Sequence, residues 1–110
     1  MDTGAQPALN QALQQLWIKF LPQMEERVSA MESANRALAE GVLSPEQRSE
    51  AAMAAHKLAG VLGTFGLGEG TELAREAELI YSRESGAKPE DAGQLDSITR
   101  QLTELIRNHS

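Results

Sequence analysis

The sequence contains no cysteine among its 110 residues. Disulfide bonds, thiol catalysis and cysteine-ligated zinc are therefore excluded. No run approaches the roughly 20 consecutive apolar residues of a membrane span. The N-terminus also lacks the basic start and apolar stretch of a signal peptide. We therefore expect a cytoplasmic protein that does not enter a membrane.

Positive charge is also scarce. The chain has 10 lysines and arginines against 16 aspartates and glutamates, which gives a formal net charge of −6. Binding to nucleic acid needs a basic surface, so we expect no nucleic-acid partner. The length suits one hydrophobic core and not two, and we treat residues 1–110 as a single domain.

No segment has the pattern of a strand, whereas apolar residues recur at helical spacing along the chain. We expect four main helices, at about 22–40, 45–65, 71–84 and 90–107. A shorter helix is expected in front of them from about Pro7, and Pro22 should end or kink it, because proline lacks an N–H and clashes with the preceding turn. The predicted fold class is all-α, an antiparallel four-helix bundle over about residues 8–107 with a short additional N-terminal helix.

Turn and capping residues set the expected boundaries. Gly41 suits the left-handed backbone that often follows a helix. Ser44, followed by a proline and then by Gln47, is typical of an N-cap with a capping box. Gly66 should break the helix that starts there, and Thr71 is expected to cap the next one.

The most informative stretch begins at His56. At about 100° per residue, Leu58 and Leu62 fall on the apolar side of the predicted helix, and His56 falls roughly opposite. A lone histidine near apolar residues is more often a structural group, but this one faces away from the core. A reactive group in the middle of a five-turn helix is also held more rigidly than one on a loop.

Two glycines share the histidine's side of the helix. Gly60 and Gly63 fall within roughly 40° of His56. A glycine inside a helix costs about 0.5–1 kcal/mol relative to alanine, so the pair requires an explanation. Either a neighbouring helix approaches closely there, or bare backbone clears space so that another protein can reach the imidazole. Helix geometry alone does not choose between the two.

The run H-x-L-x-G-x-x-G-x-x-G-L resembles the signature of histidine-containing phosphotransfer (Hpt) domains of two-component phosphorelays. The matching positions are His56, Leu58, Gly60, Gly63, Gly66 and Leu67. The family usually has a lysine three residues after the histidine, where this chain has Ala59. The resemblance covers nearly the whole chain and implies a helical bundle.

The resemblance also implies a function. His56 would accept a phosphoryl group and exchange it with the aspartate of a receiver domain, in a response regulator or a hybrid histidine kinase. A neutral imidazole is a good nucleophile, and phosphoryl transfer needs mainly alignment and charge neutralisation. The receiver would bring the aspartate and a bound Mg²⁺, so this chain needs no cofactor of its own.

The surroundings of His56 give two further predictions. Lys57 lies about 100° from His56, on the flank away from Ala59. It either reaches the phosphoryl group in place of the missing lysine or is a solvated surface residue. Ala52, Met53 and Ala59 are predicted to form a small apolar patch beside the histidine, where the receiver docks.

Other functional classes have weaker support. The sequence has no nucleotide-binding glycine loop, catalytic triad or pair of catalytic carboxylates, so we do not expect an enzyme with its own kinase or ATP-binding domain. Neither His56 nor His109 has a glutamate three residues before it, which excludes a di-metal carboxylate site; we expect no metal. Because of Ala59, one alternative stays open: an Hpt-shaped interaction module that binds receiver or kinase domains without being phosphorylated.

Overall fold

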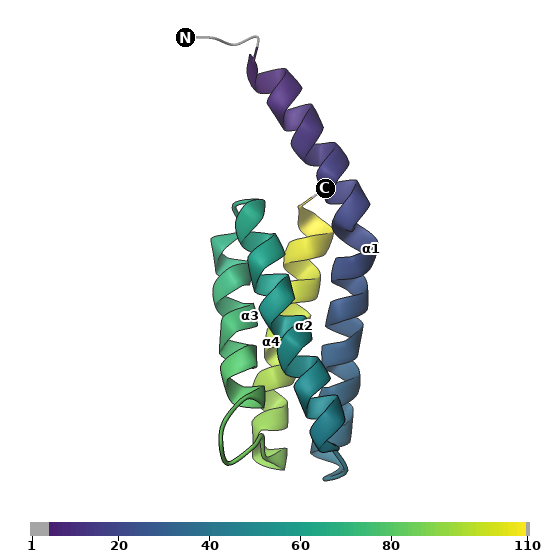
Figure 1. Cartoon of the computed structure of the whole chain (residues 1–110), viewed down its shortest axis with the longest axis vertical. Coiled ribbons are helices and arrows are strands. Elements are labelled where there is room, and N and C mark those ends of the chain that lie inside the picture. Colours follow the sequence, from purple (N-terminus) through teal and green to yellow (C-terminus); the bar gives the residue numbers. More distant parts are fainter. Residues whose placement is uncertain (1–4, 110) are drawn as a thin grey trace.

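The computed structural model describes residues 5–109, with side chains described from residue 10 onward. This part of the chain is all-α (Figure 1). Its helices are α1 (Ala5–Ala39), α2 (Pro45–Thr64), α3 (Gly68–Tyr81) and α4 (Ala92–Asn108), with a 3₁₀ turn, η1 (Pro89–Asp91), in front of α4. α2 packs against α1 and α3, and α4 packs against the same two helices. The predicted antiparallel four-helix bundle is confirmed, with α2 and α4 at diagonal corners.

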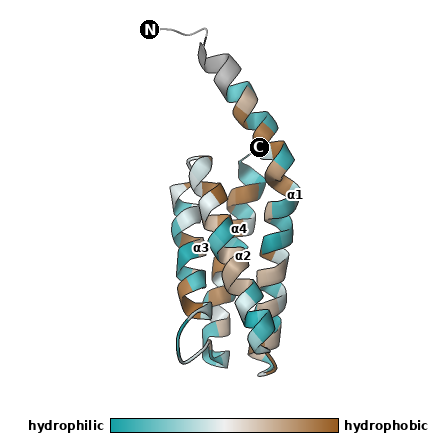
Figure 2. Ribbon diagram, in the orientation of Figure 1, coloured by the Kyte–Doolittle hydropathy of each residue, from teal (hydrophilic) through white to brown (hydrophobic). Residues whose placement is uncertain are grey.

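The core is formed by one apolar stripe from each helix. In Figure 2 hydrophilic and hydrophobic positions alternate along each ribbon, as amphipathic helices require. On α4 the buried stripe is Leu95, Ile98, Leu102 and Ile106. Burying an aliphatic side chain of this size contributes about 1.5–3 kcal/mol. These stripes fix which face of each helix is left for solvent and partners.

One polar pair lies inside this core. The Tyr81 hydroxyl of α3 donates to the Asn35 Oδ1 of α1, and both side chains are buried. Burial raises the pKa of the Tyr81 hydroxyl above its ordinary value. The Asn35 Nδ2 has no hydrogen-bond partner within the described residues. Because a buried polar group is costly without its partner, this pair favours one register of α1 against α3.

Pro22 does not end a short N-terminal helix as predicted, although the N-terminal part of α1 is inclined to the rest of the helix (Figure 1). α1 is one helix of 35 residues with Pro22 inside it, so there is no separate N-terminal helix. Trp17 and Met24 are both buried and hold the helix to the bundle on either side of the proline. Pro22 has no N–H to donate to the Ile18 carbonyl. Both residues are exposed, so water can solvate that carbonyl. Figure 1 shows the N-terminal part of α1 inclined and projecting past the end of α4.

The loop before α2 follows the sequence signals. Gly41 has φ +73°, the left-handed backbone expected at that position. The Ser44 Oγ accepts a hydrogen bond of 3.1 Å from the Gln47 N–H, which confirms Ser44 as the N-cap. α2 then runs to Thr64, and Gly66, with φ +75°, turns the chain into α3.

The expected start of the next helix is wrong. α3 begins at Gly68, not at Thr71, and Leu67 occupies the capping position. The glycine turn reverses the chain at once, so Thr71 already lies in the first turn of α3. Its hydroxyl donates across to the Ala59 carbonyl of α2, at 2.9 Å, instead of capping its own helix. α3 ends at Tyr81 and α4 begins only at Ala92, because the turn at Pro89 is 3₁₀ rather than α-helical.

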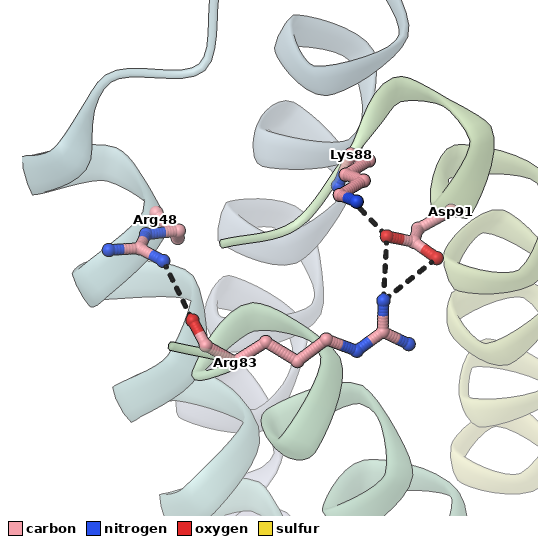
Figure 3. Close-up of polar contacts among 4 residues, drawn as sticks. All are labelled: Arg48, Arg83, Lys88 and Asp91. Atoms are coloured by element: carbon pink, nitrogen blue, oxygen red, sulfur yellow. Dashed lines mark hydrogen bonds and ion pairs between the residues drawn. The ribbon is translucent and has the colours of Figure 1, made fainter. Parts of the chain in front are cut away.

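The loop between α3 and α4 is tied down by the polar contacts drawn in Figure 3. The Arg83 Nη1 lies 3.1 Å from the Asp91 Oδ2, and the Lys88 backbone N–H donates to the same carboxylate at 2.8 Å. The Arg48 Nη1 of α2 donates to the Arg83 carbonyl at 3.2 Å. The Lys88 hydrogen bond and the nearby Arg83 guanidinium hold the pKa of the Asp91 carboxyl below its ordinary value. We call these four residues the loop latch.

Within residues 5–109, no helix combines the length and the hydropathy that crossing a membrane would require.

Candidate functional site

His56 lies near the middle of α2 and points into solvent. Its side chain is 72% exposed. Its neighbours Ala55 and Leu58 are fully buried on the opposite side of the helix. The expectation that the histidine faces away from the core is confirmed. A rigid, exposed imidazole can be reached by another protein without any rearrangement of the bundle.

Among the described residues the imidazole has one hydrogen-bond partner, which no pattern in the sequence indicated. The His56 Nδ1 lies 2.9 Å from the Glu78 Oε2 of α3. An ionised carboxylate can only accept a hydrogen bond, so in the neutral imidazole this contact favours the tautomer with the proton on Nδ1 and the lone pair on Nε2. No local sequence pattern links these residues, because they are 22 positions apart and meet only through the packing of α3 on α2.

The two glycines beside His56 have different roles. A Cβ placed on Gly60 would meet no atom within 4 Å, so this glycine leaves open space on the histidine's face. A Cβ on Gly63 would lie 3.3 Å from the Thr71 Oγ1, so here α3 approaches closely. The close approach of a neighbouring helix therefore explains Gly63, whereas at Gly60 the structure shows only open space.

The predicted apolar patch is smaller than expected. Met53 is 56% exposed and Ala52 is partly exposed. Ala59, however, is 3% exposed and cannot contribute docking surface. It is buried because its side of α2 faces α3, where the Thr71 hydroxyl reaches the Ala59 carbonyl. The surface beside His56 is therefore formed by Met53, part of Ala52 and the bare backbone at Gly60.

Lys57 is exposed, on the other side of α2 from Glu78. It lines a groove between α1 and α2 together with Glu26, Arg27 and Met53. The ring nitrogen bound to Glu78 faces α3, so Lys57 and Glu78 flank His56 from opposite directions. The structure does not bring Lys57 into contact with the imidazole.

The second histidine belongs to a different cluster. The ring centroid of His109 lies 4.1 Å from that of Trp17, and Trp17 lies 5.1 Å from Phe65 in an edge-to-face arrangement. The sequence offered no partner for His109, because stacking on α1 depends on where α4 ends in space. This aromatic cluster holds the C-terminal ends of α2 and α4 against α1, and we assign His109 a structural role.

The described residues 5–109 contain no group of three or more histidines, cysteines, aspartates or glutamates that could hold a metal ion.

Comparison with known proteins points to one family. The family model described as "Hpt domain" matches residues 15–108. The chain is also 30% identical over 94 residues to Protein RcaC of Microchaete diplosiphon. That alignment covers 86% of this chain and 14% of the relative, so the chain spans about one seventh of RcaC. No solved structure gives a significant match.

Proposed function

The chain belongs to the family of Hpt domains, the phosphotransfer modules of phosphorelays, and we propose that its phosphoryl acceptor is His56. In this proposal His56 exchanges the phosphoryl group with the aspartate of a receiver domain. The observation that carries the proposal is the exposed imidazole whose Nδ1 is held by Glu78, 2.9 Å away, so that Nε2 faces outward as the nucleophile.

The transfer needs one bond to form and one to break. The Nε2 lone pair attacks the phosphorus of the receiver's aspartyl phosphate, and the P–O bond breaks with its electrons returning to the aspartate carboxylate. The ring keeps its Nδ1 proton and gains positive charge as the N–P bond forms. The Glu78 carboxylate, hydrogen-bonded to that proton, stabilises this charge.

The partner supplies the rest of the chemistry in this proposal. The receiver brings the aspartate and a bound Mg²⁺, which aligns the phosphoryl group and neutralises its charge. Met53, Ala52 and the open backbone at Gly60 form the surface on which the receiver docks. We also propose that the exchange takes place in the cytoplasm, where kinases have the ATP that supplies such relays.

The proposal is tested by phosphoryl transfer from a labelled receiver domain. Wild type should take up label that is stable in base and labile in acid, as a phosphohistidine is, and His56→Gln should take up none. His109→Gln is the matched control and should be labelled like wild type. Label retained in His56→Gln would contradict the assignment.

The same assay distinguishes the relay role from the alternative, an Hpt-shaped interaction module that is not phosphorylated. An interaction module would bind receiver domains without being labelled by any of them. Binding of wild type to a receiver with no transferred label, over several receivers, would therefore favour the non-phosphorylated module and overturn the relay proposal.

A further inference from the structure

The phosphorylated site would carry more negative charge than the chain visibly neutralises. A phosphoryl group on the His56 Nε2 adds close to two negative charges, and the Glu78 carboxylate already lies against the same ring. Developing charge on a transferring phosphoryl group is normally stabilised by a positioned cation. A cation of this chain beside Nε2 would meet that need when the receiver leaves.

Lys57 is poorly placed for this task. It lies on the α1 side of α2, in a groove that also contains Glu26 and Arg27. A Cβ on Gly60 would meet no atom from elsewhere in the chain within 4 Å, so the turn after His56 has room for a side chain from a neighbouring helix.

The pairing of α2 with α3 places an arginine opposite the turn of α2 that follows His56. Glu78 contacts His56, and the Thr71 hydroxyl contacts the Ala59 carbonyl, so these two α3 residues face α2. Arg75 lies four residues after Thr71 and three before Glu78, which puts it on the same face of the helix. At 1.5 Å of rise per residue it is about 4.5 Å along the axis from Glu78. It therefore stands opposite the turn of α2 that contains Ala59 and the open Gly60, as the side-by-side course of the two helices in Figure 1 allows.

The Arg75 side chain is available for a new partner. It is exposed. The ion pairs formed within residues 5–109 are His56–Glu78 and Arg83–Asp91, and Arg75 takes part in neither. Its neighbour one turn away, Glu78, is occupied by the imidazole. An arginine side chain is long enough to cross this space, and its planar fork of N–H groups matches two phosphoryl oxygens.

We propose that Arg75 binds the phosphoryl group on His56 and stabilises it during transfer. This inference rests on the proposed function and adds a second helix to the phosphoryl site. Glu78 would hold the ring from one nitrogen, and Arg75 would hold the phosphoryl group attached to the other. In this arrangement α2 carries the nucleophile, His56. Helix α3 carries the two charged residues, Glu78 and Arg75, that would bind the ring and the phosphoryl group.

The first test uses NMR on the wild-type chain. Phosphoramidate, a small donor that needs no partner protein, is used to phosphorylate the chain, and the side-chain Nε–H signals of the arginines are followed. The Arg75 signal should shift on phosphorylation, while the signal of Arg100, on the diagonally opposite helix α4, should stay. An unshifted Arg75 signal in a chain phosphorylated at His56 would overturn the inference and leave the proposed function intact.

The second test measures the rate of transfer from a phosphorylated receiver. Arg75→Ala should slow transfer about tenfold, the effect of one lost hydrogen bond between charged groups. Arg75→Lys should recover part of the rate, whereas Arg100→Ala and Lys57→Ala should stay within about twofold of wild type. A slow Lys57→Ala beside a normal Arg75→Ala would identify Lys57 as the cation instead. Absence of label on wild type would overturn this inference together with the proposed function.

Discussion

The His56 Nδ1 lies 2.9 Å from the Glu78 Oε2, although the two residues are 22 positions apart in the chain. The contact joins the middle of α2 to the last turn of α3 on the outer surface of the bundle. It orients the imidazole, and in the proposed transfer it leaves Nε2 as the attacking nitrogen. The first prediction therefore concerns Glu78.

Glu78→Ala should remove the preference for a proton on Nδ1. Nitrogen NMR shifts of the His56 ring should report the Nδ1–H form in wild type and mainly the Nε2–H form in the variant. Transfer from a receiver should slow by about tenfold or more, because a hydrogen bond to a charged group contributes about 1.5–3 kcal/mol. Glu76→Ala, which removes a neighbouring exposed carboxylate, is the control. An unchanged ring tautomer in Glu78→Ala would contradict the assigned role.

Gly60 and Gly63 should respond differently to alanine. Gly60→Ala should raise the free energy of unfolding by about 0.5–1 kcal/mol, since the new methyl group enters open space within a helix. Gly63→Ala should gain less or lose stability, because its Cβ would lie 3.3 Å from the Thr71 Oγ1. Urea unfolding of both variants measures the difference. Equal gains at the two positions would show that α3 does not constrain Gly63.

Met53→Glu should weaken receiver binding while the bundle stays folded. Met53 is 56% exposed beside His56, and a carboxylate there would replace apolar contact surface with a charge that must be desolvated. We expect the dissociation constant to rise about tenfold or more, measured by calorimetry with a receiver domain. Val42→Glu changes an apolar residue that is 68% exposed, in the loop before α2, and should bind normally. Unchanged binding by Met53→Glu would exclude this surface as the docking site.

The loop latch should make stability depend on pH at the acidic end. The pKa of Asp91 is lower in the folded chain than its ordinary value. The ionised carboxylate therefore adds to the free energy of unfolding above about pH 4, where an unperturbed aspartate is also ionised. The contribution is lost as the pH falls through the folded pKa. Asp91→Asn should therefore be less stable than wild type by about 1 kcal/mol at pH 7, and the difference should shrink below about pH 4.

Urea unfolding between pH 7 and pH 3 tests this dependence. Asp96→Asn, an exposed aspartate on α4 that forms no ion pair within the described residues, is the control and should show no such pH-dependent gap. If the difference in the free energy of unfolding between wild type and Asp91→Asn stayed constant with pH, the carboxylate charge would not be what stabilises the loop.

Much of this protein is determined by local sequence. Helical spacing of apolar residues, the Ser44 cap and the glycine at 66 were sufficient to predict the bundle and the bounds of α2. The outward direction of His56 also followed, because residues on one helix share a fixed angular relation. These are short-range effects, in which each residue acts on neighbours within about a turn of helix.

The tertiary structure decided everything that depends on a second helix. It brought Glu78 to the imidazole, buried Ala59 against α3, and separated the open space at Gly60 from the close approach at Gly63. It also kept α1 continuous through Pro22, because buried residues on both sides outweigh the lost hydrogen bond. Packing of helices selects one register among many that the same amphipathic stripes would permit. The sequence therefore identified His56 as the candidate phosphoryl acceptor, and only the packing of α3 on α2 determined its surroundings.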